Sequence, residues 1–79
     1  MNIFEIKEAK INSYLKYLYE HGATAKTKTA RIESVERTLR VDDRLFDEIT
    51  KYLLAQGYIR RSATKEVYIT KLGVGKLKK

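Results

Sequence analysis

Apolar residues recur with a helical period in three stretches of this chain and with a period of two in a fourth. Spacings of three, four and seven residues predict helices over residues 3–21, 30–39 and 43–56. After Gly57 the apolar residues alternate, and residues 58–70 are predicted to form two strands joined by a turn at 62–66. Gly57 is suited to end the third helix, because glycine adopts the left-handed conformation without strain.

The same spacings predict which side chains form the core. In the first helix the inward stripe comprises Phe4, Ile11, Leu15 and Leu18, flanked by Tyr14 and Tyr19. The third helix and the strands are predicted to bury Leu45, Phe46, Ile49, Tyr52, Leu53, Ile59, Val67 and Ile69.

A second apolar group makes the first helix more apolar than one small core requires. Ile3, Ile6, Ala9 and Tyr17 belong to this group. Exposed apolar surface of this kind is typical of association surfaces, so we expect a homodimer through this helix, with Ile3, Ile6 and Tyr17 in the interface. The alternative is that the first six residues fold back over the core. Lys7 falls within the stripe, so either its stem extends along apolar surface or the helix begins later.

Residues 23–29 alternate small residues or threonine with lysine and are consistent with two structures. They form either a short edge strand or a loop in which Thr27 or Thr29 caps the next helix. In both cases Lys26 and Lys28 come close to the N-terminus of that helix, where unpaired amides and ammonium groups bind phosphate.

A further capping signal marks the start of the third helix. Asp42 or Asp43 is expected to cap the helix over residues 43–56.

Composition narrows the class of protein. A chain of 79 residues makes a single domain, residues 1–79, and with no cysteine and one histidine it lacks the ligands of a structural zinc site. It has no glycine-rich phosphate loop, no HExxH motif and no histidine placed to activate a serine, so we expect no enzyme, no metal, no cofactor and no small-molecule ligand. No apolar run approaches the roughly 20 residues of a membrane-spanning helix, and a cytoplasmic protein is expected.

The net charge of +7 is unevenly distributed along the chain. Residues 1–22 have three basic and three acidic side chains, residues 23–40 five and two, residues 41–58 two and four, and residues 59–79 seven and one. The positive charge therefore lies before the second helix, in the hairpin and at the C-terminus, as on a polyanion-binding surface. The alternative is that this charge serves solubility alone.

The order of helix, helix, tight turn, helix and hairpin resembles a winged helix-turn-helix domain over nearly the whole chain. The segments that carry the likeness are IESVERTL, RVDD, RLFDEITKYLLAQ, GYIRR, SATKE and VYITKLG. They are similar to small archaeal, plasmid or viral winged-helix transcriptional regulators. The resemblance implies an α+β fold with three helices, a two- or three-stranded β-wing and a short basic C-terminal turn. It also implies that Thr70 caps this last turn and that Leu72 returns from it to the core.

The resemblance also implies a homodimeric, double-stranded DNA-binding regulator of transcription, with helix 43–56 in the major groove and the wing on the backbone or minor groove. The predicted DNA-binding residues are Lys26, Lys28, Thr29, Arg31, Asp43, Arg44, Asp47, Glu48, Lys51, Arg60, Arg61, Lys65 and Lys71. Two alternatives stay open. One is a protein-interaction winged helix in a transcription or replication assembly, which the acidic third helix favours; the other is a weakly specific architectural DNA binder.

Individual residues of the third helix have two interpretations. Arg44 has the donors to bind guanine, and Asp47 or Glu48 can accept a hydrogen bond from cytosine. Alternatively, the carboxylates only stabilise the helix by pairing with Arg44 and Lys51 one turn away.

Overall fold

Over residues 3–78, which are those described by the computed structural model, the chain forms four helices and a three-stranded antiparallel sheet. Side chains are described from Lys7 to Lys78. The elements are α1 (Ile3–Glu20), β1 (Ala30–Arg31), α2 (Ile32–Leu39), α3 (Asp43–Gln56), β2 (Ile59–Ala63), β3 (Glu66–Ile69) and α4 (Lys71–Leu77). The predicted α+β class is confirmed, and the bounds of α1 and α3 agree with the prediction within one residue.

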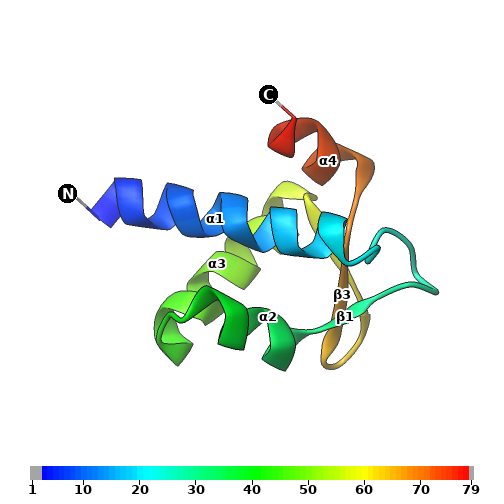
Figure 1. Ribbon diagram of the computed structural model, residues 1–79, viewed down its shortest axis with the longest axis horizontal. Helices are drawn as coiled ribbons and strands as arrows, with labels where there is room; N and C mark the ends of the chain where they lie inside the picture. The colour runs from blue at the N-terminus through cyan, green and yellow to red at the C-terminus, as the bar shows by residue number, and fades with distance from the viewer. Residues whose placement is uncertain (1–2, 79) are drawn as a thin grey trace.

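The sheet has the strand order β1-β3-β2, so the last strand of the hairpin lies in the centre. Figure 1 shows α1, α2 and α3 on one side of the sheet and the loop between α1 and β1 on the other. The second helix begins at Ile32 rather than at residue 30, because residues 30–31 pair with β3 instead. The hairpin turn is also shorter than predicted, since β2 extends to Ala63 and β3 begins at Glu66.

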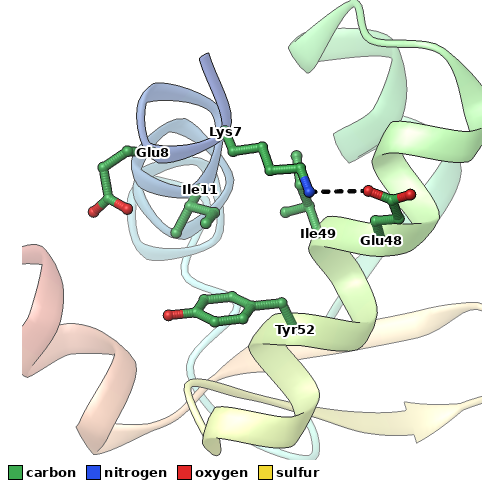
Figure 2. A pocket seen from close by; sticks show the side chains of 6 residues that line it. All are labelled: Lys7, Glu8, Ile11, Glu48, Ile49 and Tyr52. Atoms are coloured by element: carbon green, nitrogen blue, oxygen red, sulfur yellow. Dashed lines mark ion pairs between the residues drawn. The ribbon is translucent and has the colours of Figure 1, made fainter. Parts of the chain in front are cut away.

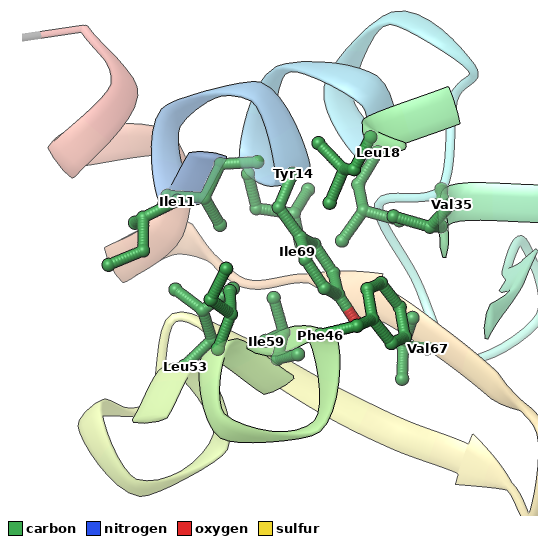
Figure 3. Packing of buried hydrophobic residues seen from close by; sticks show 13 residues of the cluster. Ile11, Tyr14, Leu18, Val35, Phe46, Leu53, Ile59, Val67 and Ile69 are labelled. Atoms are coloured by element: carbon green, nitrogen blue, oxygen red, sulfur yellow. The ribbon is translucent and has the colours of Figure 1, made fainter. Parts of the chain in front are cut away.

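The core lies between α1, α3 and the sheet. Tyr14 of α1 stacks on Phe46 of α3 with ring centroids 5.3 Å apart (Figure 3). Its hydroxyl forms a hydrogen bond of 3.1 Å with the buried Thr50, a residue that the apolar pattern did not mark as inward. Burial raises the pKa of Tyr14 to about 12, against the opposing effects of this hydrogen bond and the charge of Arg61.

Several core predictions are confirmed and three differ from the structure, since Leu45 is only half-buried and Tyr52 and Leu72 are exposed. The side chain of Phe4, also predicted to be inward, lies outside the described residues. Ile11, Leu15, Leu18 and the predicted strand residues are buried. Tyr52, predicted to be buried, is 43% exposed at the margin between α1 and α3, and Leu72 is 63% exposed. Leu72 lies outside because its neighbour Gly73 faces the sheet: a Cβ at Gly73 would stand 2.2 Å from the Tyr58 carbonyl oxygen.

The C-terminal segment is a helix, so the prediction of three helices and a single last turn was wrong. Thr70 caps α4 as predicted, since its hydroxyl accepts a hydrogen bond of 3.2 Å from the Gly73 amide. The same hydroxyl donates to the Gly57 carbonyl at the end of α3. Lys76 pairs with Glu8 at 3.1 Å, which ties α4 to α1.

Helices α2 and α3 are joined by residues 40–42. Arg40 adopts a left-handed conformation with φ of 55°, and its amide donates to the Glu36 carbonyl at 3.0 Å. Lys10 of α1 donates to the last carbonyl of α2, that of Leu39, at 2.8 Å. Of the two caps predicted for α3, Asp42 is the one formed, accepting from the Leu45 amide at 2.7 Å.

Candidate nucleic-acid interface

The exposed face of α3 carries charges that are largely paired within the protein. Lys51 pairs with Asp47 one turn away at 2.9 Å, which agrees with the second interpretation of this carboxylate, that it stabilises the helix. Glu48 pairs with Lys7 of α1 at 3.1 Å. Within residues 7–78, Arg44 is exposed and forms no ion pair, so it is the side chain of α3 best placed to meet an anion.

The carboxyl groups of Glu33, Glu36 and Asp43 lie close together where α2 meets α3, and this cluster is here called the acidic junction. A hydrogen bond with the Asp43 carboxyl raises the pKa of Glu36, and burial and the charges of Asp43 and Glu33 act in the same direction. Asp43, a predicted DNA-binding residue, therefore lies beside other carboxyl groups. Such a group repels phosphate unless it is protonated or binds a base amino group.

Arg60 and Arg61 of β2 lie on opposite faces of the sheet. Arg60 is directly across from Tyr68, whose two neighbours in β3 are buried, so both Arg60 and Tyr68 face away from the core. Arg61 is across from the buried Val67 and so lies on the helical side. The charge of Arg61 acts on Tyr14, which agrees with this position. The two arginines also border a hollow of about 390 Å³ between β2 and the end of α3.

The segment 23–29 is a loop held against the sheet. The Ala23 carbonyl accepts from the Ile69 amide at 2.8 Å, and the Ala25 carbonyl accepts from the Lys28 amide at 2.9 Å. The Lys26 carbonyl accepts from the Ser62 hydroxyl at 3.0 Å. Of the two predicted structures the loop is therefore the correct one, and the edge strand lies just after it. The side chains of Lys26 and Lys28 are exposed.

The start of α2, where unpaired amides were predicted to bind phosphate together with Lys26 and Lys28, is arranged differently. Thr29 caps no helix; its hydroxyl donates to the Glu66 carboxylate. Arg31 occupies the capping position of α2 with no side-chain hydrogen bond to the helix. The first amide of the helix, that of Ile32, donates to the Lys65 carbonyl at 2.9 Å, so it is already occupied by the hairpin turn.

The structure thus divides the predicted DNA-binding residues by side of the sheet. Arg44, Lys51 and Arg61 lie on the helical side, and Lys65 lies at the hairpin turn, 3.7 Å from Glu33. The outer side carries Lys26, Lys28, Thr29, Arg31 and Arg60. Lys71 begins α4, at the opposite end of β3 from the hairpin turn. No sequence signal indicated the Ser62 contact that fixes the outer loop, because it joins residues 36 positions apart.

A hollow of about 240 Å³ lies between α1 and α3 and is lined by Lys7, Glu8, Ile11, Glu48, Ile49 and Tyr52. Figure 2 shows Lys7 extending across it to Glu48, with the ring of Tyr52 at its border. The side chains of Ile3 and Ile6 lie outside the described residues. Tyr17 is half-buried and stacks on His21 with centroids 4.0 Å apart.

A comparison of this chain with protein-family models, curated proteins and solved structures finds no match. Over residues 3–78, none of the helices has the length and apolar character needed to cross a membrane. The same part of the chain holds no group of three or more histidine, cysteine or acidic side chains arranged for a metal ion.

Proposed function

We propose that this chain is a winged helix-turn-helix protein that binds double-stranded DNA and regulates transcription. The connection between elements supports this proposal: α2 and α3 are joined by the three residues 40–42, and a hairpin follows whose second strand pairs with β1. In this arrangement α3 enters the major groove and the hairpin turn contacts the backbone or minor groove.

The observation that carries the proposal is the position of Arg44 and Arg61 on the helical side. Both are exposed, and neither forms an ion pair within residues 7–78. Cationic side chains that form no ion pair within the protein attract phosphate at long range and bind it at short range. Lys51 and Lys65 join them readily, because their ion pairs are exposed and such pairs stabilise a protein by only about 0–1 kcal/mol.

Base reading by α3 would depend mainly on Arg44. A guanidinium can bind the O6 and N7 atoms of guanine together. Asp47 and Glu48, by contrast, are engaged with lysines, and Asp43 lies in the acidic junction. The expected recognition is therefore narrow: one guanine per bound α3, with the remaining affinity from phosphate contacts.

Pairing of two copies through α1 forms part of the proposal. The first turns of α1 extend past the ends of α3 and α4 in Figure 1. Beside them lie the hollow between α1 and α3 and the partly exposed ring of Tyr52. Apolar surface next to a projecting helix is typical of association surfaces, and two copies would present two α3 helices to one duplex.

Fluorescence anisotropy with labelled duplex DNA tests this function. We expect binding at low salt that weakens as salt rises, because counterions are released from the phosphates. Arg44→Ala should weaken binding to a selected sequence by roughly 1–3 kcal/mol and to random duplex by much less. Lys16→Ala, which removes one positive charge from the exposed surface of α1, is the control and should affect both sequences slightly and equally.

Two results would contradict the proposal. Absence of duplex binding at low salt would exclude DNA binding and favour a protein-interaction function for α3, whose paired charges suit a protein partner. Equal weakening of selected and random duplexes by Arg44→Ala would exclude base reading and leave a weakly specific binder.

A further inference from the structure

The outer face of the sheet carries a cationic surface that faces away from α3. We propose that Lys26, Lys28 and Arg60, here called the outer patch, bind the phosphates of a second duplex segment while α3 holds the first. This inference rests on the proposed function and extends it from one DNA-binding surface to two.

Strand pairing places Arg60 in this patch. Val67 and Ile69 of β3 are buried on the helical side, so Tyr68 between them faces outward. Arg60 stands directly across from Tyr68 and shares its face. Arg61 stands across from Val67 and belongs to the helical side, so two consecutive arginines serve different surfaces.

The loop before β1 brings the two lysines to the same side. Figure 1 shows this loop on the side of the sheet opposite the helices. The hydrogen bond of 3.0 Å from the Ser62 hydroxyl to the Lys26 carbonyl joins the loop to β2, two residues after Arg60. The bond of 2.8 Å from the Ile69 amide to the Ala23 carbonyl joins it to β3. Because the loop is already ordered, binding an anion there costs less conformational entropy.

The charges of the outer patch are not compensated within the protein. Lys26, Lys28 and Arg60 are exposed and form no ion pair in the part of the chain from Lys7 to Lys78. The acid on this face is Glu66, which accepts the Thr29 hydroxyl and stands across from Arg31. The face therefore keeps a positive excess suited to phosphate.

The sheet separates the outer patch from α3. The outer patch is therefore expected to bind a second duplex segment and not the duplex that lies along α3. Duplex DNA is stiff, with a persistence length of about 150 base pairs. A duplex lying along α3 would have to curve sharply around the hairpin to reach the outer patch. A second segment reaches it without bending.

A bridging measurement tests the inference. One biotinylated duplex is fixed on beads, the protein is added at low salt, and capture of a second, fluorescent duplex is measured. Wild type should capture the second duplex. The variant Lys26→Ala/Lys28→Ala/Arg60→Ala should capture less of the second duplex, by a factor on the order of ten or more. Its capture should also depend less on salt, with a log–log slope smaller by about 2–3, because three phosphate contacts are lost.

A matched variant separates the two surfaces. Arg44→Ala/Lys51→Ala/Arg61→Ala also removes three positive charges, but from the helical side. It should lose binding of the first duplex, measured by anisotropy, whereas the outer-patch variant should keep most of that binding. All six side chains are exposed, and thermal unfolding of both variants serves as the check that they are folded.

Three results would overturn the inference. Wild type that binds single duplexes without bridging them has one DNA-binding surface, and the proposed function then stands alone. Bridging retained by the outer-patch variant would assign it to two α3 surfaces of a dimer. Loss of single-duplex binding and of bridging in equal measure would show one continuous surface. Absence of any duplex binding by wild type is distinct from these results, because it removes the proposed function itself.

Discussion

Helix α3 and the loop 23–29 both carry lysines that were predicted to bind DNA, but the two regions use their charges differently. In α3, Lys51 pairs with Asp47 at 2.9 Å, and Glu48 of the same face pairs with Lys7 at 3.1 Å. In the loop, the Lys26 carbonyl accepts from Ser62 of β2 and the Lys28 backbone is bonded to Ala25 of the loop itself. The ammonium groups of both lysines form no ion pair among the described residues.

The difference has a cause in backbone geometry. A helix places side chains one turn apart at ion-pair distance, so opposite charges on one face pair readily. A tight turn satisfies its amides and carbonyls by backbone hydrogen bonds and directs its side chains outward. The charge counted along a sequence is therefore not the charge available to a ligand: Lys26 and Lys28 of the loop stay unpaired, whereas Lys51 of α3 does not.

The largest expected effect on α3 comes from ionising Tyr14 of α1, whose hydroxyl forms a hydrogen bond with Thr50 of α3. Its folded-state pKa of about 12 lies above the ordinary value of 10.0. The folded state thus favours the neutral phenol. This preference adds to the free energy of unfolding in full below pH 10, and the addition is lost as pH rises through 12. A shift of two units corresponds to about 2–3 kcal/mol of unfolding free energy.

Urea unfolding measured at several pH values between 9 and 12 tests this prediction. Tyr14→Phe has no phenol at this position and should lose less stability across the range than wild type. If the two proteins lose stability in parallel over this range, the neutral phenol of Tyr14 does not contribute as described.

The loop can be loosened by a smaller change. Ser62→Ala removes the hydroxyl that donates to the Lys26 carbonyl, and we expect a loss of about 0.5–1.5 kcal/mol at most. Hydrogen exchange at the Lys28 amide should accelerate, because the loop loses its connection to β2. Ser13→Ala is the matched control, since the Ser13 hydroxyl donates to a carbonyl of its own helix at 3.0 Å. Unchanged exchange at Lys28 in Ser62→Ala would show that the loop is held by its other bonds.

The smallest expected effect concerns the acidic junction before α3. Because the pKa of Glu36 is raised, its protonated form is favoured in the folded state. This preference stabilises the protein at low pH, and the stabilisation is lost as pH rises through the raised pKa. Glu36→Gln should therefore raise the melting temperature slightly at pH 7, and its advantage over wild type should shrink as the pH falls and Glu36 becomes protonated. Glu20→Gln, an exposed change on α1, is the control. A lower melting temperature for Glu36→Gln at pH 7 would mean that the Glu36 carboxylate has a stabilising partner.

Periodicity predicted the parts of the fold that depend on local spacing. The bounds of α3, a cap at Asp42 or Asp43, the change to strands after Gly57 and the inward strand residues all follow from nearest neighbours in the sequence. The fourth helix was missed because two glycines within seven residues argue against a helix, whereas Gly73 is there to allow close contact with the Tyr58 carbonyl.

The candidate site was less accessible to sequence analysis. Residue types predicted a basic surface, but the division of Arg60 from Arg61 depends on the register of β2 against β3. The pairing of Glu48 with Lys7 depends on how α1 crosses α3. The position of the loop depends on Ser62. The contacts of Glu48 with Lys7 and of Ser62 with Lys26 join residues far apart in the chain, for which one sequence offers no periodic signal.

The close contact at Gly73 restricts which substitutions the chain can accept. A side chain there would meet the Tyr58 carbonyl oxygen and, at 2.6 Å, the Cγ1 atom of the buried Ile69. Alanine already exceeds the space, so the last helix would have to separate from the sheet, and the Lys76–Glu8 link to α1 would be strained. In evolutionary terms, position 73 accepts glycine alone as long as α4 stays docked, whereas Gly75, with no atom within 4 Å of a Cβ, is free to vary.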